Sequence, residues 1–461
     1  MKQTETIAAI ATGLSDSGIG MIRISGEDAI AVGNRVFRSK NGCHNLYDYG
    51  SHTIHYGYVV DGEKTLDEVM ISVMKAPNSY TREDTVEINC HGGILITLKI
   101  LETVLKYGAR PAEPGEFTKR AFLNGRIDLT EAEAVMDLIQ SRNEYALKAS
   151  MNQLKGSVSD PIRRIREEIL HEIAFIESAL DDPEHINTDG YPEGLVLKVE
   201  EWTKKCDGLI ATADNGILLK EGIRTVILGK PNVGKSSLLN LLAGEEKAIV
   251  TEIPGTTRDI LEEYIRLDGI SLHVIDTAGI RFTQDVVEKI GVDRAVQMAD
   301  QADLILYVAD SSVPLDEDDE RVFSLLGEKK GIVLLNKSDL ESVVTEEMLR
   351  ERIPSSFPVI HTSMKEERGM EELSARVRDL FYSGQIEINE ETVITNIRHK
   401  QALVEARDSL RLVKGSLEQQ LPEDFYSIDL MSAYAALGSI LGEEVGEDLI
   451  DEIFSKFCMG K

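Results

Sequence analysis

The feature that most constrains the fold is a phosphate-binding motif in the middle of the chain. Residues 229–236 read GKPNVGKS and match GxxxxGK[S/T]; they follow a short apolar run and precede a helical pattern that opens at Ser236. Glycines in such a loop let backbone N–H groups surround phosphates, while Lys235 supplies a positive charge and the Ser236 hydroxyl can bind Mg²⁺. The motif therefore predicts a P-loop α/β domain, with nucleotide contacts from Asn232, Val233, Gly234, Lys235, Ser236 and Ser237.

Further motifs follow in the order found in GTP-binding domains. Asp276-Thr277-Ala278-Gly279 ends a predicted strand, where the aspartate can reach Mg²⁺ through water and the glycine N–H can contact the terminal phosphate. Asn336-Lys337-Ser338-Asp339 follows another strand, and the Asp339 carboxylate can accept from both N–H groups on the Watson–Crick edge of guanine. Thr362-Ser363-Met364 occupies the place of the usual SAK-like base loop. With the loop 254–259, these motifs resemble those of translation-factor-related GTPases and predict binding of Mg-GTP.

The residue that positions the attacking water is not set by these motifs. Ras-type proteins carry a glutamine directly after the DxxG motif, but here that position is Ile280. Glu288 follows in the segment 287–291 and is the strongest carboxylate candidate for this role. From spacing alone, an ordinary solvated charge on a helix is an equal alternative.

The alternation of strand and helix patterns predicts a multidomain protein. Residues 1–124 combine strands with a helix at 94–107, as in an α+β domain, and a hairpin with a longer loop near Asp61-Gly62 joins strands at 53–60 and 68–74. Residues 222–386 alternate strands and helices, as in an α/β fold with a mostly parallel sheet. The segments 125–221 and 387–461 are helix-rich, which predicts one discontinuous all-α domain into which the α/β domain is inserted.

Local patterns predict how individual elements begin and pack. Thr130–Glu133 matches a capping box, which predicts that a helix starts there. Trp202 and Cys206 are interpreted as core residues, because they share one helical stripe with Leu195, Val199, Leu209 and Ala213. The remaining predictions are helical stretches at 395–418 and 427–457, strands at 6–11 and 18–25, and buried strands at 224–228, 271–275, 304–309, 332–335 and 359–361.

Composition restricts the partners and the compartment. The 50 Lys and Arg residues stand against 80 Asp and Glu residues, giving a formal charge of −30, so a chain-wide basic surface for nucleic acid is excluded. No apolar run approaches the roughly 18 residues that cross a bilayer, and the first residues lack a signal-peptide pattern. The four cysteines are scattered without a CxxC pair, which favours neither a disulfide framework nor a zinc site. We therefore expect a cytoplasmic protein with no membrane segment.

Several strings together resemble the MnmE (TrmE) family of bacterial and organellar tRNA-modification GTPases. They are the P-loop, the doubled threonine of 254–259, the segment 287–291, the strings at 77–84 and 114–124, and the C-terminal FCMGK of 457–461. The resemblance implies an N-terminal folate-binding domain that forms a homodimer and takes formyl-tetrahydrofolate or methylene-tetrahydrofolate. It also implies a flavin-dependent partner, GidA (MnmG), in a heterotetramer or larger complex that holds most of the tRNA. The implied activity is addition of an aminomethyl or carboxymethylaminomethyl group to carbon 5 of the wobble uridine.

The same resemblance implies individual site residues. The folate contacts fall on Arg23, Glu83, Arg126 and Lys461, with arginine at 126 where the family often has lysine. K⁺ replaces an arginine finger, with ligands at Asn232, Thr251, Ile253 and Thr256, while the Mg²⁺ ligands are Ser236 and Thr257. Thr251 and Thr257 also complete the nucleotide contacts, and Lys235 and Glu288 are the implied catalytic residues of hydrolysis. For Cys458, a catalytic nucleophile, a wall of the folate pocket and a structural residue all stay open, because nearby acidic residues do not favour a thiolate.

Two other functions are compatible with parts of the sequence. A ribosome-assembly GTPase of the Era or Der kind shares the DxxG segment without glutamine, but it would need a basic RNA-binding domain where this chain has acidic helices. A purely regulatory GTPase would drive its partner through a conformational cycle and carry no modification chemistry itself.

Overall fold

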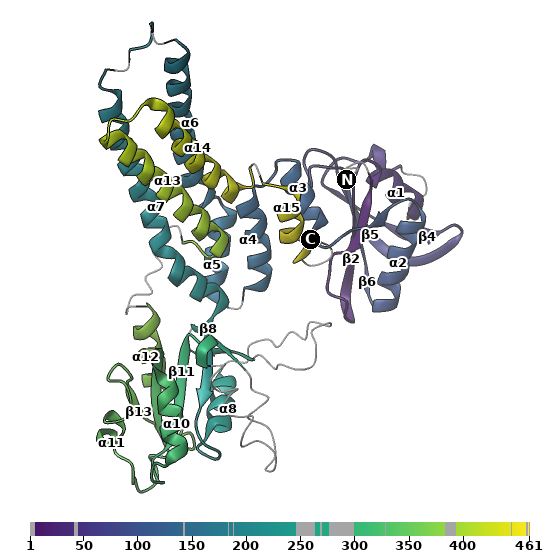
Figure 1. Cartoon of the computed structure of the whole chain (residues 1–461). Coiled ribbons are helices and arrows are strands. Elements are labelled where there is room, and N and C mark those ends of the chain that lie inside the picture. The colour runs from purple at the N-terminus through teal and green to yellow at the C-terminus, as the bar shows by residue number, and fades with distance from the viewer. Residues whose placement is uncertain are drawn as a thin grey trace. The chain divides into compact units, whose positions relative to one another are not determined.

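The computed structural model describes residues 5–40, 45–141, 143–182, 184–187, 189–245, 263–267, 270–275, 299–327, 329–382, 393–443, 445–457 and 460. The chain divides into two compact units (Figure 1). Unit 1 comprises Met1–Met136, Gln153–Asn187 and Leu421–Lys461, and unit 2 comprises Asp137–Asn152 and Thr188–Gln420.

Unit 1 contains a seven-stranded sheet in the order β3-β4-β5-β6-β2-β1-β7. Its strands are β1 (Ile7–Ile10), β2 (Ser17–Ser25), β3 (Phe37–Ser39), β4 (Thr53–Asp61), β5 (Lys64–Met74), β6 (Thr85–Gly92) and β7 (Arg110–Pro111). Helices α1 (Ala29–Val36) and α2 (Ile94–Lys106) cover one face (Figure 1). Alternate residues of β5, Val69, Ile71 and Val73, are buried under them, as expected for a sheet with one core face.

The β4–β5 hairpin differs from its prediction. Asp61 pairs with Lys64, so the loop has two residues rather than being longer, and Gly62 has a φ of 63°. Glycine adopts this conformation at no steric cost, and two-residue loops of this kind match the twist of paired strands. The sequence patterns also did not predict β6, a central strand that pairs with both β2 and β5.

The helical part of unit 1 packs α6 (Ser159–Asp181) beside α14 (Glu423–Leu441), as Figure 1 shows. The helical stretch predicted at 427–457 is two helices, because the chain breaks at Gly442, with a φ of 86°, before α15 (Glu447–Ser455). A Cβ at Gly442 would lie 2.8 Å from the Cβ of Leu129, so this turn requires glycine. Helices α3 (Glu116–Leu123) and α4 (Leu129–Gln140) lie earlier in the chain.

The capping box predicted at Thr130–Glu133 is wrong by two residues. The N–H of Glu131 donates to Asp128 Oδ1 at 2.9 Å, and the N–H of Asp128 donates to Glu131 Oε2 at 2.8 Å. Thr130 instead donates its hydroxyl to Asp128 Oδ1 at 2.6 Å. Aspartate and threonine are both good N-caps, and here the earlier of the two takes the position because α4 already begins at Leu129.

Unit 2 joins a helical part to an α/β part. Helices α7 (Tyr191–Glu221) and α13 (Ile397–Glu418) pack side by side, and α5 (Glu144–Leu154) precedes them in the chain. Trp202 and Cys206 are 1% and 0% exposed, which confirms their interpretation as core residues. Burial, followed by the nearby Asp207, raises the pKa of the Cys206 thiol to about 12, so this cysteine stays protonated and inert.

The α/β part is a six-stranded sheet in the order β13-β12-β11-β8-β10-β9. The strands are β8 (Ile223–Leu228), β9 (Glu263–Leu267), β10 (Ile270–Val274), β11 (Leu304–Asp310), β12 (Lys330–Asn336) and β13 (Val359–His361); the helices are α8 (Lys235–Glu245), α10 (Glu317–Leu326), α11 (Glu346–Arg350) and α12 (Met370–Tyr382). The five predicted strands are confirmed. They are parallel, whereas β9, which the sequence patterns do not predict, runs antiparallel to β10.

The strand order places β8 between β11 and β10. The chain therefore adds β9 and β10 on one side of β8 and then crosses over to add β11 on the other side. In open α/β sheets, ligands bind beyond the carboxyl ends of the strands at such a switch point. The combination of an α+β part, a helical part and a P-loop α/β part confirms the predicted fold class, while the bounds of the four predicted segments stay predictions. Among the helices of the described residues, none has the length and apolar character that crossing a membrane requires.

Candidate functional site

The P-loop lies between β8 and α8, at the switch point of the sheet. Gly229 has a φ of 145° and Gly234 a φ of 111°, conformations that other residues rarely adopt. A Cβ at Gly229 would lie 2.3 Å from the carbonyl oxygen of Val308, and a Cβ at Gly234 would lie 2.3 Å from Asn336 Nδ2. The two glycines therefore let the loop approach β11 and the guanine motif closely.

Lys235 is held by the loop that it belongs to. Its Nζ donates to the carbonyl oxygens of Gly229 and Lys230, both at 2.6 Å. Burial lowers the pKa of Lys235 to about 8, and a bound phosphate would favour the charged form again. Because α8 begins at Lys235, the N–H groups of its first turn are directed toward the P-loop. Such a helix N-terminus suits an anion.

Asn336 connects three of the predicted motifs. Its side chain is 2% exposed, and its Nδ2 donates to the carbonyl oxygen of Val233 in the P-loop at 2.7 Å. Its Oδ1 accepts from the N–H of Met364 at 3.2 Å and from the Thr362 hydroxyl at 3.4 Å. The P-loop and the two loops predicted to bind guanine, 336–339 and 362–364, therefore meet at the buried side-chain amide of Asn336.

Asp339 is held as an ionised acceptor at this meeting point. The Ser363 hydroxyl donates to Asp339 Oδ1 at 2.8 Å, and this hydrogen bond lowers the pKa of the carboxyl group. Lys337, with a φ of 62°, places its Nζ 2.5 Å from Asp310 Oδ2. A carboxylate in this loop suits the paired N–H donors of guanine.

The remaining predicted residues of the nucleotide site are only partly described. Ser236 and Ser237 are exposed in the first turn of α8, and Asn232 is exposed in the P-loop with a φ of 63°. Thr251, Ile253, Thr256, Thr257, Asp276, Thr277, Ala278, Gly279 and Glu288 lie outside the described residues. The hydroxyl of Ser236 and the amide oxygen of Asn232 are hard, neutral oxygen donors, which fits their predicted roles toward Mg²⁺ and K⁺.

Two of the predicted folate contacts meet at an aromatic ring in unit 1. The guanidinium carbons of Arg126 and Arg23 lie 4.7 and 5.5 Å from the centre of the Tyr80 ring. Arg23 also donates to Glu87 Oε1 at 2.9 Å and to the carbonyl oxygen of Gly460 at 3.3 Å. Arginines stacked on an aromatic ring keep their in-plane N–H groups available for a carboxylate.

Glu83, a further predicted folate contact, already has partners within the chain. Its carboxylate accepts from Arg120 Nη1 at 3.1 and 3.0 Å and from the Ser25 hydroxyl at 2.8 Å. The sequence patterns did not single out Arg120, which is 6% exposed; its only local signal is the (i, i+4) spacing to Glu116. Lys461 and Cys458 lie outside the described residues.

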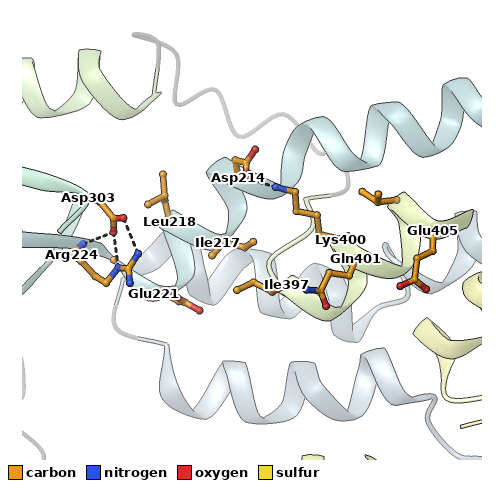
Figure 2. A pocket seen from close by; sticks show the side chains of 12 residues that line it. Asp214, Ile217, Leu218, Glu221, Arg224, Asp303, Ile397, Lys400, Gln401 and Glu405 are labelled. Carbon is orange, nitrogen blue, oxygen red and sulfur yellow. Dashed lines mark hydrogen bonds and ion pairs between the residues drawn. The ribbon is translucent and has the colours of Figure 1, made fainter. Parts of the chain in front are cut away.

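A cavity of about 840 Å³ lies elsewhere in unit 2, between the end of α7, the start of α13 and the start of β8 (Figure 2). Four of its charged groups form two pairs: Arg224 donates to both oxygens of Asp303 at 3.0 Å, and Lys400 donates to Asp214 at 2.6 Å. Its lining in the described part of the chain includes no predicted site residue. The cavity is therefore separate from the nucleotide site.

Comparison with known proteins covers both units. The model of the family described as "GTP-binding protein TrmE N-terminus" matches residues 6–126, and that of the "MnmE helical domain" matches residues 129–458. The tRNA modification GTPase MnmE of Lachnoclostridium phytofermentans is 55% identical over 459 residues, covering 100% of both chains. The proteins of that name from Geobacillus kaustophilus and Bacillus subtilis are each 46% identical; the alignments cover 100% and 99% of this chain and 100% of each relative.

Proposed function

Because this chain belongs to the MnmE family of tRNA modification GTPases, we propose that its GTP hydrolysis serves modification of the wobble uridine in certain tRNAs. With a flavin-dependent partner, GidA (MnmG), it adds an aminomethyl or carboxymethylaminomethyl group to carbon 5 of that base. The observation that carries the GTPase part is the buried Asn336 amide, which bonds to the P-loop and to the 362–364 loop. The full-length similarity to MnmE relatives favours this function over a ribosome-assembly switch.

In the proposed hydrolysis, each group of the nucleotide site has a separate task. Lys235 and the start of α8 bind the phosphates, and Asp339 selects guanine. Ser236 with Thr257 would hold Mg²⁺, while Asn232 with Thr251, Ile253 and Thr256 would hold K⁺. A bound K⁺ supplies positive charge that offsets the charge developing on the phosphates during hydrolysis. Glu288 orients the attacking water.

We expect hydrolysis to be about tenfold faster in K⁺ than in Na⁺ at equal ionic strength, a difference of about 1.4 kcal/mol in the barrier. The proposed ligands, loop carbonyls and an asparagine oxygen, would suit the larger ion. Turnover is measured at saturating GTP in matched chloride salts, with equal Mg²⁺. Equal rates in the two salts would remove K⁺ from the mechanism.

For the modification step, we propose that unit 1 binds a formyl- or methylene-tetrahydrofolate, which supplies the one-carbon unit. Arg23 and Arg126 would hold the glutamate tail of the folate beside Tyr80, since a guanidinium pairs well with a carboxylate. The chain forms a homodimer through this N-terminal domain. Because its net charge is −30, the cytoplasmic complex holds tRNA largely through the partner.

Substitution of Arg126 tests the folate proposal. We expect Arg126→Met to weaken binding of 5-formyl-tetrahydrofolate about tenfold, because a charge-assisted hydrogen bond contributes about 1.5–3 kcal/mol. Binding is measured by calorimetry on the full chain, with Arg38→Met, an exposed arginine on β3, as the control. Equal affinity for the Arg126 and Arg38 variants would place the folate elsewhere.

Analysis of the modified nucleosides in tRNA distinguishes the complete proposal from a purely regulatory role. A deletion strain is complemented with the wild-type chain or with Arg126→Met, and the wobble uridines are analysed by mass spectrometry. The proposal expects the carbon 5 group to be absent from the deletion strain and reduced with the folate variant. A group that persists in the deletion strain overturns the function. Full modification by a variant that no longer binds folate leaves only the regulatory role.

A further inference from the structure

Lys230, the second residue of the P-loop, forms ion pairs with two aspartates at the start of α10. Its Nζ lies 2.7 Å from Asp319 Oδ2 and 2.9 Å from Asp316 Oδ2. The Asp319 side chain is 1% exposed, whereas that of Asp316 is 56% exposed. The contact with Asp319 is therefore a largely buried ion pair, in which loss of Lys230 would leave the buried carboxylate without this partner.

The carboxylate of Asp319 is fixed by two further donors. The hydroxyl of Tyr307, a fully buried residue of β11, donates to Asp319 Oδ1 at 2.5 Å. The N–H of Asp316 donates to Asp319 Oδ2 at 2.9 Å, at the start of α10, where the helix dipole favours a negative charge. Tyr307 itself packs edge-on against Phe323 with ring centres 5.2 Å apart. The anchor is thus part of the rigid core of the sheet.

The backbone of Lys230 contacts the lysine that is predicted to bind phosphate. Its carbonyl oxygen accepts from Lys235 Nζ at 2.6 Å, so the residue that is anchored to Asp319 also carries a carbonyl that holds the phosphate-binding lysine. The end of β11 contacts the 336–339 motif as well, because Asp310 pairs with Lys337. One stretch of chain, 310–319, therefore holds a lysine from each of the two nucleotide loops.

We propose that Lys230 is a positioning residue for nucleotide binding, whose ion pair with the buried Asp319 keeps the P-loop in its phosphate-binding conformation. Lys230 acts through the loop, since its ammonium group is occupied by the two aspartates. The inference rests on GTP binding at this P-loop. It goes beyond the motif, in which the residue after the first glycine has no assigned role.

The test is equilibrium titration of the full chain with a fluorescent GDP analogue. We expect Lys230→Met to weaken binding about tenfold or more, Asp319→Asn to do the same, and Lys230→Arg to restore most of the affinity. The double variant Lys230→Met/Asp319→Asn should bind no more weakly than Lys230→Met alone, because both changes break one interaction. Turnover at saturating GTP should stay within about threefold of wild type, since the loop geometry is recovered once nucleotide is bound.

Glu320→Gln is the matched control, because Glu320 neighbours Asp319 on α10 but is half-exposed and pairs with Arg352 instead. Its affinity should equal that of wild type. Lys230→Met with unchanged GDP affinity and only a lower melting temperature would reduce Lys230 to a fold-stabilising residue and overturn the inference. Fully additive losses in the double variant would also overturn it. If the wild-type chain bound no GDP, the GTPase proposal itself would fail, which is a distinguishable result.

Discussion

Replacing Asp339 with asparagine is expected to weaken GTP binding about 100-fold and to shift the preference of the protein toward XTP. The carboxylate of Asp339, held by the Ser363 hydroxyl at 2.8 Å, can accept from both N–H groups on the edge of guanine. An amide keeps one acceptor and presents a donor in place of the other, which matches the C2 carbonyl of xanthine. Loss of charge-assisted hydrogen bonds worth about 2.7 kcal/mol corresponds to about 100-fold in affinity.

The measurement compares GTP and XTP affinities of the wild-type and variant chains by competition against a fluorescent guanine nucleotide. Asp379→Asn, at an exposed position of α12, makes the same chemical change away from the site and should leave both affinities unaltered. Ser363→Ala removes the group that orients Asp339 and should weaken GTP binding without creating XTP binding. Unaltered GTP affinity in Asp339→Asn refutes the assignment of guanine to this carboxylate.

The sequence predicts the α/β part well because its signals are local. Each buried parallel strand is a short apolar run, and each motif follows the strand that positions it, so the order of motifs along the chain already implies their convergence at one edge of the sheet. The edge strand β9 (EYIRL) escapes prediction, because its charged and polar residues are typical of sheet edges but also of loops.

Other predictions fail where tertiary contacts decide between local alternatives. Asp128 and Thr130 are both good N-caps, and Asp128, whose carboxylate also accepts from Arg163 of α6 at 2.6 Å, takes the position. The helical pattern continues across Gly442, yet the close approach of Leu129 requires a turn there. Such contacts join residues that are distant in the sequence, which no local pattern encodes.

The ion pair between Lys230 and Asp319 is not predicted from the sequence for the same reason. Lys230 and Asp319 are both charged residues in ordinary surface-like contexts of the sequence, and nothing local distinguishes Asp319 from its neighbours Asp318 and Glu320. The structure buries the Asp319 carboxylate against Tyr307 and the P-loop residue Lys230. Likewise, the sequence identifies Arg23 and Arg126 by resemblance, but Tyr80, the ring that they share, emerges only from the fold.

Substitution of Glu288 tests the catalytic step. Glu288 lies outside the described residues, and its role stays a prediction. If Glu288 orients the attacking water, Glu288→Ala should lower turnover about 100-fold and leave GTP affinity within about threefold of wild type. The lost interaction would exist mainly in the transition state, so about 2.7 kcal/mol appears in the barrier and little in binding. A solvated charge would change turnover by less than about threefold.

Single-turnover hydrolysis at saturating GTP and K⁺ measures this barrier, with nucleotide affinity determined separately. Glu351→Ala, an exposed glutamate directly after α11, controls for loss of a negative charge. Glu288→Gln separates two roles, because an amide can still hydrogen-bond to water. It should restore activity if Glu288 only orients water, and it should not if the carboxylate also accepts a proton.

In cells, wobble uridine modification that falls together with turnover would mean that hydrolysis drives the chemistry. If modification persists in Glu288→Ala, GTP binding alone suffices, because the variant still binds the nucleotide.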